Sequence, residues 1–517
     1  MSRSELLPAG WAISTLDDVA KSAGGSTPSK ADHSYWLNGS IPWVSPKDMK
    51  VFALQTAEDT ITEKALERLT VIPPESVLVV VRSGILSRTL PVALNSMAVT
   101  INQDMRAFIP EVDISARYLA WHLIANERDI LAACSKHGTT VASIEGPALA
   151  RFPLRIAPAA EQTRIVEKLE ELLSDLDAAV AELKAAQKKL AQYRQSLLKA
   201  AVEGKLTAAW RVERAQRGDA TETGAQLLAR ILTERRTRWE ARQRAKFDEQ
   251  GKAPPKGWQD KYPEPVAPDI QDLPDLPEGW VWATVDQLSP DDLANGRSVP
   301  SATVGAKVLR LTAVKDGCID LNEYKTGDWS DEEAKPFAVV DGDLLIVRGN
   351  GSLSLVGRAG LVTNAAEQVA YPDTMIRLRV LNSIIRPEWV ALLWDASFTR
   401  SHIERRARTS AGIYKISQPD ILSVVIPVPP LEEQSQILFI FERAGKEMHS
   451  VAAMLDQALK QSAAQRQNIL RAAFSGQLVP QDSDDEPASV LLERIRAERA
   501  EQAAVKKPRS RRARETA

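Results

Sequence analysis

The side chains that could form a catalytic or metal-binding centre are scattered along this chain. Its five histidines show neither an HExxH pattern nor another paired ligand spacing, and two cysteines are too few for a thiolate zinc site. No GxxxxGK[ST] phosphate loop or Asn/Asp-Pro-Pro-aromatic loop occurs, and Gly349-Asn350-Gly351 lacks the third glycine of a dinucleotide-binding turn. The sequence therefore predicts no catalytic, metal-binding or cofactor-binding residue.

One pattern is an alternative to this interpretation, because it imitates the PD…ExK carboxylates of a metal-dependent nuclease. It consists of Pro290-Asp291 followed by Glu323-Tyr324-Lys325. So short a pattern arises readily by chance in a chain with 68 acidic residues, and the first half of the sequence has no counterpart of it. We therefore do not assign a nuclease centre to these residues.

Basic, hydroxyl and amide side chains gather instead in the loops of two regions of mixed composition. Such side chains hold phosphates and read base edges in protein–DNA complexes, although each alone is more often a solvated surface residue. The candidate DNA-binding residues of the first region are Lys30, Lys47, Arg82, Ser83, Arg88, Lys136, Thr139 and Thr140. Those of the second region are Arg310, Lys315, Arg348, Asn350, Ser352, Arg358, Arg408, Tyr414 and Lys415.

The sequence elements that would position these loops occur twice in the chain. Five matches recur in the same order at an offset of roughly 266–272 residues: Leu7–Trp11 as Leu276–Trp280, Thr15 and Asp17 as Thr284 and Asp286, Val77–Arg82 as Asp343–Arg348, Ala160–Ile165 as Glu432–Ile437, and Leu198–Leu206 as Leu470–Leu478. A period this long indicates duplication of a whole domain and not a solenoid.

A long helix closes each copy, between a preceding proline and Gly204 or Gly476. In the first helix apolar residues alternate at spacings of four and three, the coiled-coil period. They form two lines, Leu169, Leu176, Leu183, Leu190, Leu197 and Ile165, Leu172, Ala179, Ala186, Tyr193, Ala200. We expect the two helices to pair antiparallel and to separate two globular parts by a rod of about 60 Å. The alternative is that each helix packs on its own globular part or on another subunit.

The length of 517 residues requires several domains, and 44% hydrophobic with 26% charged residues is a globular balance. The net charge of −2 excludes no partner class. No apolar run could span a membrane and no signal-peptide core opens the chain, so we expect a cytoplasmic protein. The expected parts are recognition domains 1–157 and 276–429, helical regions 158–250 (long helix 161–203) and 430–517 with a basic tail, and a proline-rich linker 251–275.

With these motifs in this order, the chain resembles the specificity subunit of type I restriction–modification systems. The resemblance rests on Leu-Pro-x-Gly-Trp at the start of each half, Ile41–Met49, Arg348–Ser352, the proline and Glu-Gln before each long helix, and Gly204–Arg211. It implies two mixed α/β target-recognition domains, separated by two long helices in an antiparallel coiled coil with pseudo-twofold duplication.

The resemblance also implies a function. Each domain would read one half of a bipartite site in double-stranded DNA, and the helices would set the spacer and dock two methyltransferase subunits. Those subunits and the restriction/translocase subunits would bind S-adenosylmethionine, ATP and Mg, and would perform adenine methylation and restriction. This chain would be non-catalytic. The alternative is a coiled-coil scaffold or DNA-bridging protein without sequence preference, which explains the duplication but not two diverged globular parts.

Overall fold

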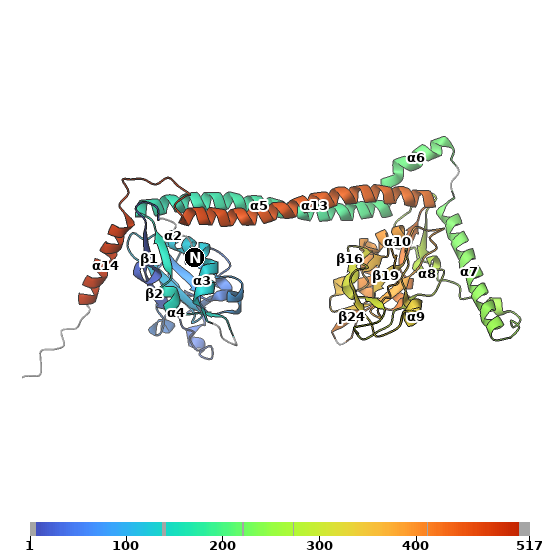
Figure 1. Ribbon diagram of the computed structural model, residues 1–517, viewed down its shortest axis with the longest axis horizontal. Coiled ribbons are helices and arrows are strands. Elements are labelled where there is room, and N and C mark those ends of the chain that lie inside the picture. Colours follow the sequence, from blue (N-terminus) through green and yellow to red (C-terminus); the bar gives the residue numbers. More distant parts are fainter. Residues whose placement is uncertain (1–6, 137–140, 220–221, 272, 411, 506–517) are drawn as a thin grey trace, which may run out of the picture. The chain divides into compact units, whose positions relative to one another are not determined.

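The computed structural model describes residues 7–136, 141–219, 222–271, 273–410 and 412–505, and the chain forms two compact units. Unit 1 combines Met1–Lys184 with Asp456–Ala517, and unit 2 is Ala185–Leu455. Each unit contains one mixed α/β domain, the first part of one long helix and the last part of the other (Figure 1). This confirms the predicted fold class.

The domain of unit 1 is built around a five-stranded sheet. Its order is β2 (Ala20–Gly24), β9 (Met105–Pro110), β6 (Ser76–Val80), β7 (Val92–Asn95) and β4 (Ala53–Leu54). All five residues of β6 are buried, as expected of a β-branched run at the centre of a sheet. The domain also contains a sheet of β5 (Asp59–Ile61), β3 (Ile41–Val44) and β8 (Thr100–Ile101), a pair of β1 (Ala12–Thr15) with β12 (Pro153–Ile156), and helices α1 (Leu16–Val19), α2 (Ala116–Ala125), α3 (Glu127–Cys134) and α4 (Gly146–Ala150).

The domain of unit 2 has a six-stranded sheet around β19 (Leu344–Val347), whose four residues are buried. The other strands are β14 (Ala294–Asn295), β22 (Met375–Leu378), β21 (Ala359–Leu361), β17 (Cys318–Ile319) and β16 (Val314–Lys315); β15 (Lys307–Leu309) pairs with β18 (Tyr324–Thr326), and β13 (Val281–Thr284) with β25 (Val425–Val428). The helices are α8 (Val285–Leu288), α9 (Asp331–Ala334), α10 (Pro387–Trp394), α11 (Ser397–Arg406) and α12 (Gln418–Leu422).

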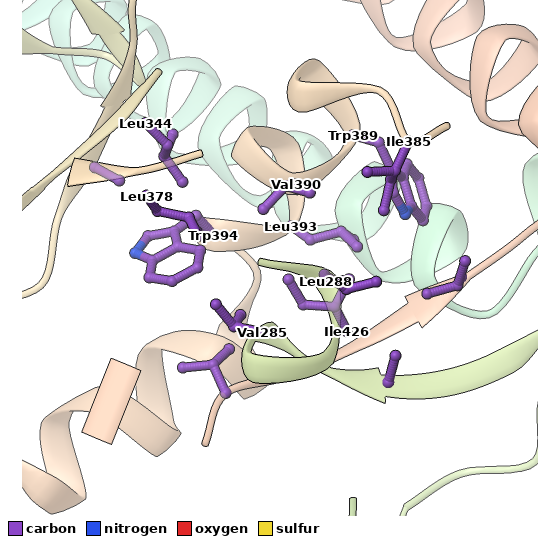
Figure 2. Close-up of a cluster of buried hydrophobic side chains, with 14 of the residues drawn as sticks. Val285, Leu288, Leu344, Leu378, Ile385, Trp389, Val390, Leu393, Trp394 and Ile426 are labelled. Atoms are coloured by element: carbon purple, nitrogen blue, oxygen red, sulfur yellow. The ribbon is translucent and has the colours of Figure 1, made fainter. Parts of the chain in front are cut away.

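The core of unit 2 is organised by two tryptophans of α10. Figure 2 shows Trp389 and Trp394 among apolar side chains of α8, β19, β22 and β25. Both indoles are buried, and each N–H has an acceptor: Trp389 donates to the Pro427 carbonyl (2.9 Å) and Trp394 to that of Gly357 (2.8 Å). Large aromatic burial without an orphaned donor stabilises this core.

The long helices α5 (Ala159–Val202) and α13 (Leu431–Phe474) pack in opposite directions in each unit. In unit 1 the start of α5 shares a buried cluster with the end of α13, and Arg466 pairs with Asp177 at 2.8 Å. In unit 2 the end of α5, Ala201 and Val202, packs with Ile437 near the start of α13. Within each unit the predicted antiparallel pairing is confirmed, against the alternative that each helix packs only on its own globular part or on another subunit.

The buried seam of α5 differs from the predicted one. The leucine line is correct, but Ala179 and Tyr193 of the second line are exposed, Tyr193 by 52%. The second line runs one residue later, through the buried Leu173 and the half-buried Val180 and Arg194. Alanines on the predicted line and two polar residues, Gln187 and Arg194, on the true line concealed this shift.

The repeated sequence motifs are the joints between each domain and its long helix. The Trp11 indole N–H donates to buried Glu161 (2.9 Å), and Trp280 donates to buried Glu433 (2.8 Å). The glutamines that follow, Gln162 and Gln434, each accept one backbone N–H and donate to one carbonyl of their own domain. Contacts between the motifs explain why they recur together.

A further helix from each copy completes the domain of the other copy. Helix α7 (Gly224–Glu249) packs on α8 and β13 of unit 2, and α14 (Ala488–Val505) packs on α1 (Leu16–Val19) and β1 of unit 1. The Gly224 N–H donates to the Gly279 carbonyl (2.6 Å), and the Ala488 N–H donates to that of Gly10 (2.8 Å). A Cβ on Gly224 would lie 2.0 Å from the Val428 carbonyl oxygen, so this joint requires glycine.

The proline-rich stretch 251–275 is packed along unit 2, whereas the sequence predicted an extended linker. The Thr284 hydroxyl donates to the Val266 carbonyl (2.7 Å), and the Trp282 indole N–H donates to that of Pro274 (3.2 Å). Thus this segment covers β13 as well as joining the copies. No helix in the described ranges combines the length and hydrophobicity needed to cross a bilayer.

Candidate nucleic-acid interface

A small sheet of unit 2, which we call ribbon 2, brings together most of the second set of candidate residues. It consists of β20 (Gly349–Asn350), β24 (Ile413–Lys415) and β23 (Arg408–Ser410), with β24 in the middle. Gly349 and Arg408 both pair with Lys415, and Asn350 pairs with Tyr414. Strand β20 of ribbon 2 follows buried β19 directly. The candidate residues that ribbon 2 brings together are Arg348, Asn350, Ser352, Arg408, Tyr414 and Lys415.

Three cations of ribbon 2 are available for a ligand. Arg348, Arg408 and Lys415 are exposed and form no salt bridge within the described part of the chain. The Asn350 side-chain oxygen accepts the Ser352 N–H (3.1 Å), which shapes the turn and directs the Asn350 amide donors elsewhere. Cations and an amide on a short β-ribbon suit a polyanion with hydrogen-bonding edges.

Unit 1 carries a counterpart, ribbon 1, at the equivalent place. Strand β10 (Ser135–Lys136) pairs with β11 (Ser143–Ile144), and Arg82, just after β6, bridges to Ser143 on the other side. This order matches that of ribbon 2, so Lys136 corresponds to Arg408. Thus Arg82, Ser83 and Lys136 lie together, while the candidates Thr139 and Thr140 lie outside the described residues.

Two members of ribbon 1 have local partners. The Arg82 guanidinium lies 3.5 Å from Asp104, a pair that is weak because Arg82 is 63% exposed. The Ser83 hydroxyl accepts the Ile85 N–H (3.4 Å) at the start of a short 3-10 turn, Gly84–Ser87. Ser83 is therefore a structural cap as well as a candidate contact. Arg88 ends this turn and is exposed.

Four candidates outside the ribbons are engaged with carboxylates. Lys47 pairs with Asp59 (3.0 Å) and Glu58 (3.1 Å), and these hydrogen bonds raise the pKa of Lys47. Hydrogen bonding to Asp320 likewise raises the pKa of Lys315. Arg310 lies beside Glu323 (3.9 Å) and Arg358 beside Asp395 (3.7 Å). To bind phosphate, these four side chains would have to exchange partners, unlike the cations of ribbon 2.

Lys30 lies apart from the ribbons, on a loop fixed by two tryptophans. The Trp36 indole N–H donates to the Ser29 carbonyl (3.1 Å), and the Trp43 indole N–H donates to that of Ser26 (3.0 Å). Lys30 itself is exposed. The loop therefore presents this lysine from a fixed base.

The carboxylates of the nuclease-like pattern each take part in a separate set of ion pairs. Asp291 pairs with Arg242, and Glu323 lies near Arg310 and Lys315. Among the described residues, no group of three or more His, Cys, Asp or Glu side chains could hold a metal ion. His122 is buried, and desolvation lowers its pKa to about 3, so it stays neutral and accepts the Arg155 backbone N–H (3.1 Å).

Sequence reasoning missed two polar residues of the ribbons. Thr409 lies opposite Tyr414 in ribbon 2, and Ser143 lies opposite both Arg82 and Lys136 in ribbon 1. Gly412, with φ of +76°, occupies the turn of ribbon 2. A glycine between two short polar, β-branched stretches is the hairpin signal that could have identified Thr409.

Comparison with known families adds a sequence relationship to this geometry. The profile of the type I restriction modification DNA specificity domain matches residues 8–186. The specificity subunit of the Escherichia coli type I restriction enzymes EcoR124I/EcoR124II is 44% identical over 160 residues, 30% of this chain and 39% of that protein. The EcoKI specificity subunit of E. coli K12 is 26% identical over 515 residues, 96% of each chain.

A solved structure shares the fold. It is described as "Structural basis underlying complex assembly and conformational transition of the type I R-M system", and the match covers 91% of this chain and 99% of that one. The TM-score is 0.61 at 17% sequence identity. This similarity extends the fold assignment over nearly the full length of both chains.

Proposed function

We propose a mode of DNA recognition for this chain. The proposal starts from its membership of the type I restriction–modification specificity subunits. Such a subunit gives the complex its DNA sequence specificity and is itself non-catalytic. We infer that ribbon 1 and ribbon 2 are its two readers, and that each binds one half of a bipartite site in double-stranded DNA.

The observation that supports this proposal most is the recurrence of one ribbon at one place in two units. The outer member of each ribbon, Arg82 or β20, directly follows the buried central strand of its domain, β6 or β19, so a rigid core holds that side of the ribbon. The major groove admits a two-stranded β-ribbon, the form of the β23–β24 pair in ribbon 2 and of the β10–β11 pair in ribbon 1. Arginine donates to guanine O6 and N7 and asparagine to adenine, so Arg348 and Asn350 are the proposed base contacts of ribbon 2.

The remaining parts of the complex are proposed from family membership. Two methyltransferase subunits dock on this chain, and restriction/translocase subunits join them. These partners bind S-adenosylmethionine, ATP and Mg and perform adenine methylation and cleavage in the cytoplasm. We also propose that the common length of α5 and α13 sets the unread spacer of the site. A scaffold without sequence preference is not favoured, since it would not need two different ribbons.

Arg348→Ala tests the proposal in the complex with methyltransferase subunits. Removal of a base-reading side chain should cost roughly 1–3 kcal/mol on the cognate sequence only. Methylome sequencing should then show relaxed recognition in one half-site, and Arg82→Ala with Lys136→Ala should relax the other half.

Arg358→Ala is the matched control, because Arg358 is an exposed arginine of the same domain that already faces Asp395. It should leave both half-sites unchanged. Equal effects of Arg348→Ala and Arg358→Ala, or relaxation of both half-sites by one ribbon's substitutions, would contradict the two-ribbon proposal.

A further inference from the structure

The two-ribbon proposal leaves unexplained an arm of unit 2, which we define as residues 235–262. The arm is the outer part of α7 and the segment that returns along it. Trp258 and Tyr262 of the return segment are buried, at 8% and 9% exposure. Trp239 of α7 stacks with Trp258 at 5.8 Å between ring centroids and meets Tyr262 edge-on at 5.4 Å. The return segment is therefore a packed part of the arm.

Ion pairs fix the arm to the domain of unit 2. The Arg235 guanidinium donates to Asp286 (3.0 Å) and to the Ser289 carbonyl (3.0 Å), and Arg242 pairs with Asp291. Because the Arg235 side chain is only 13% exposed, its pair with Asp286 is shielded from solvent. These contacts set the direction of the arm relative to its own domain.

The arm concentrates positive charge in a chain whose net charge is −2. It contains nine Lys and Arg and four Asp and Glu residues. Carboxylates engage its arginines 235, 236, 238 and 242. In contrast, Lys246, Lys252, Lys256 and Lys261 are exposed and form no salt bridge with any described residue.

The tip of the arm and ribbon 2 lie at the same end of unit 2 (Figure 1). Figure 1 shows the tip of the arm at the end of unit 2 that faces away from α5 and α13, the end where β24 also lies. Three acidic residues, Asp248, Glu249 and Asp260, share the tip, so it is not uniformly basic. Spaced lysines among carboxylates suit separate phosphates along a strand better than one compact anion.

We infer that the arm is a second DNA contact of unit 2, which binds backbone phosphates of the duplex that flanks the half-site of ribbon 2. This inference rests on the proposed function and deepens it. Lysine, a point charge on a flexible stem, holds phosphates without reading bases. The other copy has a related feature in sequence: α14 is followed by Lys506-Lys507-Pro508-Arg509-Ser510-Arg511-Arg512, outside the described residues.

The test compares the full complex carrying wild-type chain with one carrying Lys246→Gln, Lys252→Gln, Lys256→Gln and Lys261→Gln together. Three duplexes with the cognate site are used: one with both flanks, one without the flank of the unit 2 half-site, and one without the other flank. Fluorescence anisotropy gives Kd between about 50 and 200 mM salt, the range over which phosphate contacts change affinity strongly.

The slope of log K against log salt should fall by about 0.9 for each phosphate that the variant no longer neutralises. We expect this fall, and at least about tenfold weaker binding at low salt, only on duplexes that keep the unit 2 flank. Arg230→Gln with Arg238→Gln is the control on the same helix, since both arginines already pair with glutamates. This control should leave the slope unchanged.

An unchanged slope in the quadruple variant, or an equal fall on all three duplexes, would overturn the inference. So would a failure to assemble with methyltransferase subunits, which would identify the arm as a protein-binding surface. Thermal unfolding of the variant verifies that the removal of charge from the arm leaves the fold intact. Failure of the proposed function is distinguishable, because the wild-type complex would then not prefer the bipartite site over a scrambled duplex.

Discussion

The two buried glutamates at the joints should respond oppositely to the same substitution. Glu433 accepts hydrogen bonds from Trp280 and Thr207 (2.8 and 2.6 Å) and pairs with Arg211. Its counterpart Glu161 accepts only the Trp11 N–H among described residues, and its second carboxylate oxygen is buried without a partner. Both residues are 1% exposed. One carboxylate is thus compensated and the other is not.

Glu433→Gln should therefore destabilise unit 2. Removing one member of a buried ion pair costs about 3–5 kcal/mol, and the 25% exposure of Arg211 reduces our expectation to about 2–3 kcal/mol. In Glu161→Gln the amide oxygen still accepts from Trp11, while an uncompensated buried charge disappears. We expect a gain of about 1 kcal/mol in the free energy of unfolding of unit 1.

The effect of Glu161→Gln should depend on pH. Burial raises the pKa of Glu161 above 4.5; the Trp11 hydrogen bond and Arg164 oppose this shift, and Asp485 adds to it. The stability that protonated Glu161 contributes is fully present below pH 4.5 and is lost as pH rises through the folded pKa. The advantage of the variant should thus be small in acid and complete at neutral pH.

Hydrogen exchange of the full chain measures these effects separately, since two units need not unfold together. Amides at the start of α5 report on unit 1, and those at the start of α13 report on unit 2. Equal losses of protection in both variants would refute the reasoning, because they would show that the missing partner of Glu161 has no energetic consequence.

Two further predictions concern the site as a whole. Exchange of residues 1–157 for a relative's domain should change one half-site in the methylome and leave the other unchanged. Helix α14 must be exchanged as well, because its Leu491 and Ile495 complete the core of unit 1. A change in both half-sites would contradict recognition by separate domains. Four residues can be inserted in each long helix, between Ser196 and Leu197 and between Asn468 and Ile469. This adds about 6 Å to each helix and should lengthen the spacer by about two base pairs. An active variant with the original spacer would show that the helices do not set the spacer length.

Local patterns predicted the elements whose cause is local. Proline before and glycine after each long helix and the coiled-coil period gave correct elements. The duplication predicted which motifs recur. Physical contact between these motifs, as in Trp11 with Glu161, was not readable, because it joins residues 150 positions apart.

The rest depended on packing that periodicity does not record. The second seam line of α5 contains Arg194, which pairs with Asp395 (3.7 Å), so composition indicated the neighbouring line instead. The proline content of 251–275 suggested an extended linker, although the buried Trp258 and Tyr262 fix this segment against unit 2. The candidate loop residues form ribbons through strand register, and no spacing along the chain reveals that Arg82 lies beside Ser143.

The two copies are alike at the joints between domain and long helix, and they differ in the ribbons. At the joints both copies use the same residues. A tryptophan indole N–H donates to a buried glutamate, and a glutamine side chain accepts a backbone N–H of its own domain. At the ribbons they differ: Lys136 stands where Arg408 does, and Ser143 stands where Lys415 does. Two identical ribbons on a twofold frame would read a symmetric site. Joints that are alike and ribbons that differ are instead what recognition of two unlike half-sites requires. This is the strongest reason to place specificity in the ribbons.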